Sequence, residues 1–345
     1  MKEKTNILSS KSHLLTLLRE KQGNAISGNF IAKELGVSRV AVWKTVQSLI
    51  EAGYSIETKE TGYLLDPKNE KDFLYPWEFG EKEKHFFHYF NTESTMDRAR
   101  ESAFKGAESG SVFTAEKQSA GRGRHGRTWV SKQGGLFFTV LNKPPKHGLP
   151  LTIADYTFFP LIMQIALVKS ISEICGKKAY LRWPNDIYIN NKKIAGITTE
   201  IFGEGDLLSW LTTGIGVNAN NKPPSSKATS IIEITGNQLS LKKVLCKILE
   251  KTENIKKCFI TKAAYSQGNI SLASEWNSLS DSIGAKAVIF EPEKKDNKSF
   301  DISGKILARG IFMGIDPAGR CILKTNTEKG ELYFNHGSVS MAILN

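Results

Sequence analysis

The chain has 345 residues, of which 40% are hydrophobic and 24% charged, a balance typical of a soluble globular protein with two or three domains. Its four cysteines lie far apart without a C-x-x-C pair, and its first thirty residues hold no signal-peptide hydrophobic region. A disulfide framework and secretion are therefore not expected, and a cytoplasmic location is. The formal net charge of +12 at pH 7 favours nucleic acid, a nucleotide or an acidic protein as partner without choosing among them.

Residues 1–66 are predicted to form a winged helix-turn-helix DNA-binding domain. The apolar spacing indicates three helices, the last over 39–52, and Ser38 in the tight turn before it can cap that helix. The alternating run 54–65 then predicts a hairpin, which is the wing.

The third helix of this domain is expected to meet DNA. In a winged helix the polar face of this helix contacts bases while the wing reaches phosphate. The alternative is a domain used only for protein contacts, and its slightly positive charge does not decide between the two. The expected DNA-binding residues are Ser38, Arg39, Trp43, Lys44 and Gln47 on the helix, and Lys59 on the wing.

Residues 67–81, which include two prolines, are expected to be a linker, and a second domain is expected over 82–272. A strand is predicted over 85–90, where His85 and His88 face opposite sides, so no metal site is expected there.

Hydroxyl groups precede the next helix. Ser94 and Asp97 fit a capping box ahead of a helix over 98–106. Such hydroxyls usually serve as caps only, although they can also offer hydrogen bonds to a small polar ligand.

The stretch 116–129 combines backbone freedom with positive charge. Three glycines and three arginines lie within 121–127, so the backbone can approach a ligand surrounded by fixed cations, which suits an anion with several phosphate oxygens. The G-x-G-x-x-G spacing imitates a dinucleotide-binding turn, but 136–141 predicts a strand where a Rossmann turn needs a helix. For this stretch alone, a basic surface loop is the alternative.

Later segments add a core helix and further binding elements. The apolar run 156–174 is interrupted by polar residues and predicts a buried helix rather than a membrane span. Trp-Pro-Asn-Asp at 183–186 is an unusual strand start, because its proline cannot donate a strand hydrogen bond. The glycines within 213–218 permit close approach of the backbone to a ligand. The polar, proline-rich loop 219–229 is expected to be mobile until a ligand orders it.

The pattern changes towards the end of the chain. A basic amphipathic helix with a solvated face is expected over 242–259. Short strands then predict a small antiparallel barrel over 273–345, with an exposed charged loop at 291–299.

Five motifs in order resemble the bifunctional biotin protein ligases, which are biotin–[acetyl-CoA-carboxylase] ligases and biotin operon repressors. The motifs are Ser94-Thr95, Gln118 with Gly121 to Arg127, Trp183 to Asp186, Lys193 to Gly196, and Gly214 to Asn218. The resemblance covers nearly the whole chain. It implies an α+β protein with an N-terminal winged helix-turn-helix, a central mixed α/β catalytic domain like that of class II synthetase-like biotin ligases, and a C-terminal SH3-like β-barrel.

The resemblance implies a two-step reaction and a regulatory role. The family forms biotinyl-5'-AMP from biotin and ATP with Mg²⁺, and transfers biotin to a lysine of the biotin carboxyl carrier protein of acetyl-CoA carboxylase. It also implies adenylate-dependent binding to biotin operon DNA, a homodimer formed when the adenylate binds, and no membrane partner.

The resemblance also implies roles for single residues. Catalytic roles fall to Lys193, Arg124, Arg122 and Asp186, with Asp186 orienting Lys193 or the acceptor lysine. Biotin-binding residues are Ser94, Thr95, Gln118, Gly121, Arg122, Arg124, Lys193 and Gly196. Residues for ATP or the adenylate are Arg124, Arg127, Trp129, Asn185 and Asn218, with Trp129 closing over the adenine.

The sequence departs from the family pattern at a few positions. Met96 stands where asparagine is frequent, Arg182 replaces a commoner lysine, and Gly337-Ser338 lacks the usual acidic residue. The first two leave the expected chemistry unchanged, whereas the third concerns contacts of the terminal barrel.

Three alternatives remain open: a ligase whose winged helix does not repress, a transcription factor with a non-catalytic sensor domain, and a lipoate or octanoate ligase relative. The arginines together with Lys193 speak against a passive sensor, and the winged helix with Trp-Pro-Asn-Asp favours biotin over lipoate.

Overall fold

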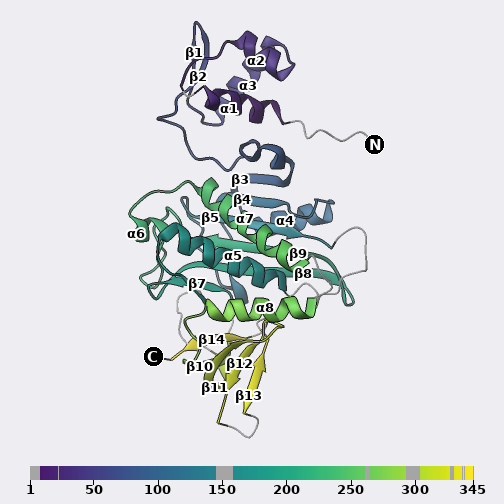
Figure 1. Cartoon of the computed structure of the whole chain (residues 1–345), viewed down its shortest axis with the longest axis vertical. Helices are drawn as coiled ribbons and strands as arrows, with labels where there is room; N and C mark the ends of the chain where they lie inside the picture. The colour runs from purple at the N-terminus through teal and green to yellow at the C-terminus, as the bar shows by residue number, and fades with distance from the viewer. Residues whose placement is uncertain are drawn as a thin grey trace. The chain divides into compact units, whose positions relative to one another are not determined.

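The computed structural model describes residues 8–21, 23–144, 158–260, 265–292, 304–326, 330–335, 337 and 339–344. The chain divides into two compact units, Met1–His88 and Tyr89–Asn345 (Figure 1). Most of the loop expected at 291–299, and parts of the motif around Gly337, lie outside the described residues.

The first unit contains the expected helix-turn-helix and wing. Serine hydroxyls cap all three helices: Ser9, Ser27 and Ser38 accept hydrogen bonds at 3.2 Å from backbone N–H groups of the first turns. Gly36 adopts a φ of 65°, which lets the chain turn between the second and third helices. The elements are α1 (Ser10–Glu20), α2 (Gly28–Leu35), α3 (Arg39–Glu51), β1 (Ile56–Lys59) and β2 (Gly62–Leu65).

Part of the segment expected to be a linker folds onto this unit. Phe73, Tyr75 and Trp77 pack against its hydrophobic core, and Trp77 lies at the start of η1 (Pro76–His85). The buried carboxylate of Glu78 accepts hydrogen bonds from the Tyr54 hydroxyl at 2.5 Å and from Arg19 at 2.8 Å. Burial, helped by the charge of Glu78, raises the pKa of Tyr54.

The second unit is built on a seven-stranded sheet with β3 and β6 at its edges. Every pairing with a resolved register, from β4 across to β6, is antiparallel. In sheet order the strands are β3 (Phe86–Thr92), β4 (Val112–Gln118), β5 (Leu136–Asn142), β9 (Leu207–Val217), β8 (Lys192–Glu204), β7 (Asp186–Ile189) and β6 (Tyr180–Arg182).

Helices cover this sheet. Figure 1 shows α5 (Phe158–Cys175) and α7 (Leu241–Ile260) running side by side across it, and α5 also packs against α8 (Tyr265–Ser278). By length and composition α5 could cross a membrane, but 72% of it is buried inside the protein, in agreement with its prediction as a core helix. Two further helices are α4 (Thr95–Phe104), which packs on β4, β5 and β9, and the short α6 (Ile231–Thr235).

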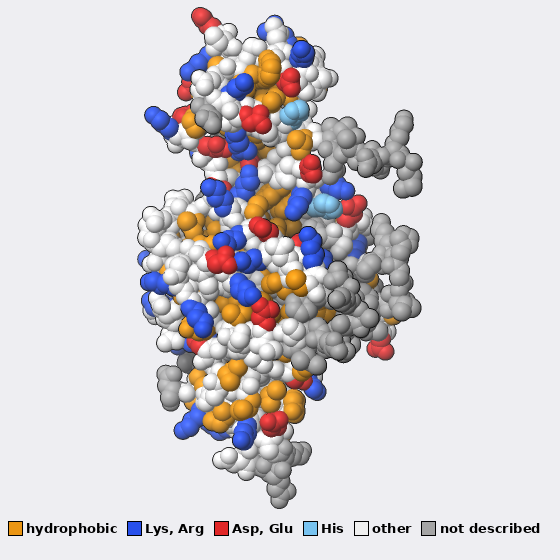
Figure 2. Space-filling view, viewed as in Figure 1, with side chains coloured by type: hydrophobic (Ala, Val, Ile, Leu, Met, Phe, Trp, Pro, Cys, Tyr) orange, Lys and Arg blue, Asp and Glu red, His pale blue; other side chains and the backbone are white. Residues whose placement is uncertain are grey.

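The C-terminal strands form a separate five-stranded antiparallel sheet in the order β13-β12-β11-β10-β14. In Figure 2 hydrophobic side chains gather over this sheet, whose strands expose Ile306, Leu307, Met313 and Tyr333. The strands are β10 (Lys286–Pro292), β11 (Gly304–Ile315), β12 (Cys321–Lys324), β13 (Glu331–Phe334) and β14 (Ser340–Ile343).

Gly62 should be the most substitution-sensitive glycine of the first unit. Its φ is 139°, and a Cβ atom there would lie 1.9 Å from the carbonyl oxygen of Ile26, which accepts a hydrogen bond from Tyr63 N–H. We expect Gly62→Ala to destabilise this unit by about 2–4 kcal/mol, because both the backbone strain and the clash must be relieved. Hydrogen exchange of residues 26–65 in the full chain measures this loss.

Gly36→Ala is the matched control, because Gly36 also has a positive φ but a Cβ atom added there would meet nothing within 4 Å. It should cost only about 1 kcal/mol, the strain alone. Equal losses in the two variants would contradict the proposed clash.

Candidate active site

Two facing glycines form the floor of the candidate site. Gly196 on β8 pairs with Gly216 on β9, and the indole of Trp129 lies against both. A Cβ atom at Gly216 would come within 2.3 Å of Trp129 Nε1, and one at Gly196 within 3.0 Å of the same ring system. The glycines expected to permit close approach to a ligand therefore admit, in this structure, a side chain of the protein itself.

The arginine-rich stretch forms a narrow loop over this floor, and residues 118–131 are called the lid from here on. Its two halves pair with each other: Trp129 N–H donates to Gly121 O at 2.8 Å, and Gly123 N–H donates to Arg127 O at 2.7 Å. A Cβ atom at Gly121 would lie 2.4 Å from Trp129 O, so this glycine serves the loop's own backbone. The element that follows the lid is the strand β5 and not a helix, so the G-x-G-x-x-G spacing here does not form a Rossmann turn.

A network of hydrogen bonds between uncharged groups lies beside the lid. Thr95 donates to Gln118 Oε1 from its backbone N–H at 2.7 Å and from its hydroxyl at 3.1 Å. Gln118 Nε2 donates to Ser131 Oγ at 2.8 Å, and Thr139 Oγ1 donates to Thr95 Oγ1 at 2.8 Å. The tertiary structure thus adds Ser131 and Thr139 to the expected set, since strand pairing brings them beside Thr95 and Gln118.

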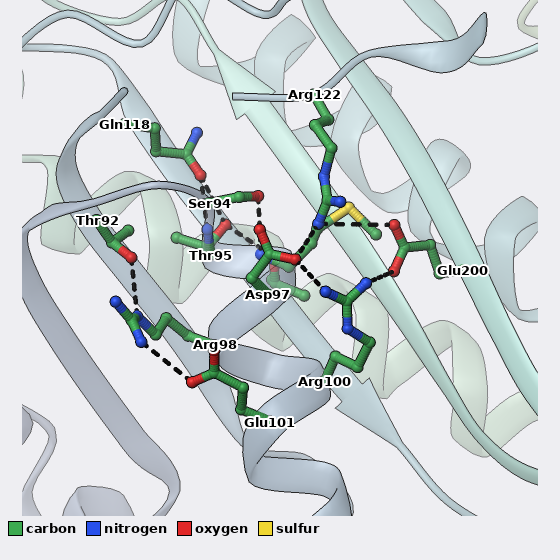
Figure 3. Close-up of polar contacts among 12 residues, drawn as sticks. Thr92, Ser94, Thr95, Asp97, Arg98, Arg100, Glu101, Gln118, Arg122 and Glu200 are labelled. Carbon is green, nitrogen blue, oxygen red and sulfur yellow. Dashed lines mark hydrogen bonds and ion pairs between the residues drawn. The ribbon is translucent and has the colours of Figure 1, made fainter. Parts of the chain in front are cut away.

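The helix α4, which follows Ser94, begins earlier than predicted. It starts at Thr95 rather than Arg98, and the Ser94 hydroxyl accepts a hydrogen bond from Met96 N–H at 3.2 Å. Ser94 is 2% exposed, so its hydroxyl is enclosed as well as capping. Asp97, which the capping-box pattern singled out, forms ion pairs with Arg100 and Arg122 (Figure 3).

Positive charge lies beside Gly196, where an added Cβ atom would meet Lys193 Cε and Asp186 Oδ1, each at 3.4 Å, as well as Trp129. Lys193 Nζ lies 2.7 Å from Asp186 Oδ1 and 5.3 Å from the centre of the Trp129 ring. Arg124 donates to the Val339 carbonyl at 3.1 Å. Burial lowers the pKa of Arg124 to about 10, against the opposing effect of Asp186, so this cation is held in a poorly solvated place.

The other residues expected around the nucleotide are less concentrated. Arg127 is exposed. Asn185 donates its amide N–H to the carbonyl of Ile197, and the buried Asn218 accepts a hydrogen bond from Asn221 Nδ2 at 3.1 Å. Both asparagine side chains therefore form hydrogen bonds with other residues of this protein.

The residues expected to bind DNA are accessible within the first unit. Ser38, Arg39, Lys44 and Lys59 are exposed, Gln47 is partly exposed, and Trp43 on α3 has 52% of its surface exposed. An exposed tryptophan between cations on one helix is unusual for a purely structural face.

Comparisons with known proteins give two family matches. The model described as "Biotin/lipoate A/B protein ligase family" matches residues 89–218, and one described as "HTH domain" matches 11–64. The bifunctional ligase/repressor BirA of Bacillus subtilis is 30% identical over 335 residues, which cover 94% of this chain and 96% of the relative. The bifunctional ligase/repressor BirA of Escherichia coli is 28% identical over 57% of this chain and 60% of the relative.

Solved structures share the fold of about three quarters of this chain. A biotin protein ligase from Aquifex aeolicus in complex with biotin and ATP superposes with a TM-score of 0.58 at 24% identity, covering 75% of this chain and 99% of that chain. A mutant of the Aquifex ligase in complex with biotin gives a TM-score of 0.57 at 26% identity, covering 74% and 97%.

Gly216→Ala should displace Trp129 from the glycine floor. The new methyl group overlaps the indole, so we expect Trp129 to become more accessible and the second unit to lose about 1–3 kcal/mol of stability. Acrylamide quenching, taken as the difference from the same protein with Trp129→Phe, measures the exposure. Gly214→Ala is the control for Trp129 exposure, because its Cβ would meet the Sδ and Cγ atoms of the buried Met96 and not the indole. Unchanged quenching in Gly216→Ala would contradict this packing.

Proposed function

The chain belongs to the biotin protein ligase family and carries an N-terminal helix-turn-helix domain. We propose that it joins biotin to a biotin carboxyl carrier protein by way of an adenylate made from ATP. The observation that carries the proposal is the near full-length similarity to a bifunctional ligase/repressor. The juxtaposition of a neutral polar cluster with a cation cluster across one glycine floor supports it.

The first step joins two anions and therefore needs fixed positive charge. A carboxylate oxygen of biotin attacks the α-phosphorus of ATP, the new P–O bond gives biotinyl-5'-AMP, and pyrophosphate leaves with the electrons of the broken bond. Two unit charges 4 Å apart interact by about 4 kcal/mol at an effective dielectric near 20, so each well-placed cation matters. Lys193, Arg124 and Arg122 are proposed to supply this charge.

The second step needs a neutral amine. The ε-amine of the acceptor lysine attacks the carbonyl carbon of the adenylate, an amide bond forms, AMP leaves with its bridging oxygen, and the nitrogen loses a proton. A free lysine has a pKa near 10.4, so a nearby carboxylate aids the reaction by orienting the amine or taking up the proton. We propose Asp186, already 2.7 Å from Lys193, for this place.

The neutral cluster suits the ureido ring of biotin. This ring is uncharged and presents one carbonyl and two N–H groups, which match hydroxyl and amide partners rather than charged ones. Ser94, Thr95 and Gln118 are proposed to bind it, with Thr139 fixing the Thr95 hydroxyl. Gly121 and Gly196 are also proposed for the biotin site, and in this structure Trp129 lies against both of them.

The nucleotide is proposed to lie at the cationic side, with Trp129 closing over the adenine and with Arg127, Asn185 and Asn218 around it. Such closure requires the indole to move relative to the floor that it now covers. Within the described residues no group of three His, Cys, Asp or Glu side chains could hold a metal, so Mg²⁺ is proposed to arrive bound to the phosphates of ATP.

We also propose a domain organisation. Residues 1–66 are proposed to bind DNA, 67–81 to connect the domains while part of this segment packs on the first unit, 82–272 to form a class II synthetase-like catalytic domain, and 273–345 to form an SH3-like barrel. A five-stranded antiparallel sheet, in which β10 lies between β11 and β14, supports a barrel. We further propose that the protein acts in the cytoplasm without a membrane partner and forms a homodimer when the adenylate binds.

The helix-turn-helix domain favours repression over a ligase function alone. Arg39, Trp43 and Lys44 are exposed on α3, available to DNA. The relatives in Bacillus subtilis and Escherichia coli are both named ligase/repressors. We propose that the adenylate strengthens binding to the biotin operon control region.

Biotin-dependent exchange of labelled pyrophosphate into ATP tests the ligase proposal. We expect exchange with biotin but not with lipoate or octanoate, and a loss of about 100- to 1,000-fold in Lys193→Ala, because a cation at the reacting phosphate is removed. Lys192→Ala, one residue away and exposed, should retain activity. Exchange with lipoate but not biotin would contradict the assignment.

A gel-shift titration with the biotin operon control region tests repression. Biotin together with ATP should tighten binding by about tenfold or more, a coupling typical of linked sites. Lys44→Ala should weaken binding, whereas Lys33→Ala on α2 is the matched control. Equal DNA binding with and without the two substrates would contradict the repressor proposal and leave the ligase proposal unaffected.

A further inference from the structure

Four charged side chains tie the lid to the sheet and to α4 (Figure 3). Asp97 Oδ1 lies 2.5 Å from Arg122 Nη2 and 2.5 Å from Arg100 Nη2. On β8, Glu200 lies 3.9 Å from Arg122 and 3.8 Å from Arg100. Two carboxylates thus hold two guanidinium groups in one alternating cluster.

This cluster differs from an ordinary surface ion pair. An isolated exposed pair contributes little, but networks with short, well-formed contacts contribute more. The Asp97 side chain has only 20% of its surface exposed and Glu200 has 34%, whereas Arg122 and Arg100 have 39% and 42%. Asp97 also lies in the first turn of α4, where the helix dipole favours a negative charge. The position of Asp97 is therefore set by α4 rather than by the lid.

The cluster contacts the lid at its middle, through Arg122. The first residues of the lid are fixed by backbone hydrogen bonds, from Ser119 N–H to Thr92 O at 3.0 Å and from Ala120 N–H to Glu93 O at 2.9 Å. Near the tip, Arg124 meets the Val339 carbonyl. Between these, Arg122 is the lid residue that reaches carboxylates on two separate elements, and a rigid guanidinium can bridge them at once.

We propose that Asp97 and Glu200 are positioning residues, which hold Arg122 and so order the lid before biotin binds. This inference rests on the proposed ligase function and deepens it, because neither acid was expected to belong to the site machinery. A lid that is already ordered loses less conformational freedom on binding, so substrate affinity gains without any new contact to the ligand. The acids act through Arg122, not on the reacting atoms.

Removing either carboxylate charge should loosen the lid in the ligand-free protein. In Asp97→Asn and in Glu200→Gln we expect trypsin to cleave after Arg122, Arg124 or Arg127 about fivefold faster than in the unaltered chain, with the sites identified by mass spectrometry. In pyrophosphate exchange, the KM for biotin should rise about fivefold while kcat changes by less than about twofold, since ordering rather than chemistry is lost.

Glu101→Gln is the matched control. Glu101 lies on the same helix and pairs with Arg98 at 3.0 Å, but that pair does not include a lid residue. It should leave both the cleavage rate and the KM unchanged, and thermal unfolding of all three variants shows whether the fold is retained. Asp97→Glu should restore part of the protection.

The two measurements separate the two proposals. Lid cleavage in Asp97→Asn and Glu200→Gln no faster than in Glu101→Gln would overturn the positioning role, whatever the enzyme activity. If the unaltered chain shows no biotin-dependent exchange, the ligase proposal fails while the cleavage experiment still decides whether the acids hold the lid.

Discussion

The arrangement of the site depends on two residues that lack side chains. Because Gly196 and Gly216 face each other across β8 and β9, a flat ring can lie directly on the backbone, and Trp129 does so with its Nε1 buried and unpartnered among the described residues. A buried N–H group without a partner is costly, so the close packing of this ring on the two glycines has to offset that cost.

Electrostatics divides the surface around this floor into two parts. Neutral hydroxyl and amide groups from Thr95, Gln118 and Thr139 occupy one part, and Lys193 with Arg124 occupies the other. A ligand with an uncharged polar ring at one end and a reactive carboxylate at the other fits such a division, since each end meets groups that match its charge.

The cations themselves are not equivalent. Arg122 is committed to Asp97 and Glu200, Lys193 is paired with Asp186, and Arg124 is desolvated with a backbone carbonyl as its partner. Arg124 therefore has the least compensated charge, whereas Arg122 and Lys193 are each held in place by carboxylates before they meet an anion. The same residue type in one short stretch can thus have separate tasks.

The amino-acid sequence alone determined the helix-turn-helix, its serine caps, the strand after the lid, the buried helix α5 and the ordered motifs of the family, because local spacing and turn chemistry act over a few residues. The sequence pattern predicted that α4 begins at Arg98. It begins at Thr95, because Ser94 caps the helix directly. The sequence did not indicate that Phe73, Tyr75 and Trp77 pack on the first unit, nor that Ser131, Thr139 and Glu200 join the site. Those partners lie far from one another in the chain, and only the register of the sheet, which pairs Gly196 with Gly216 and carries Glu200 to Arg122, decided which side chains meet.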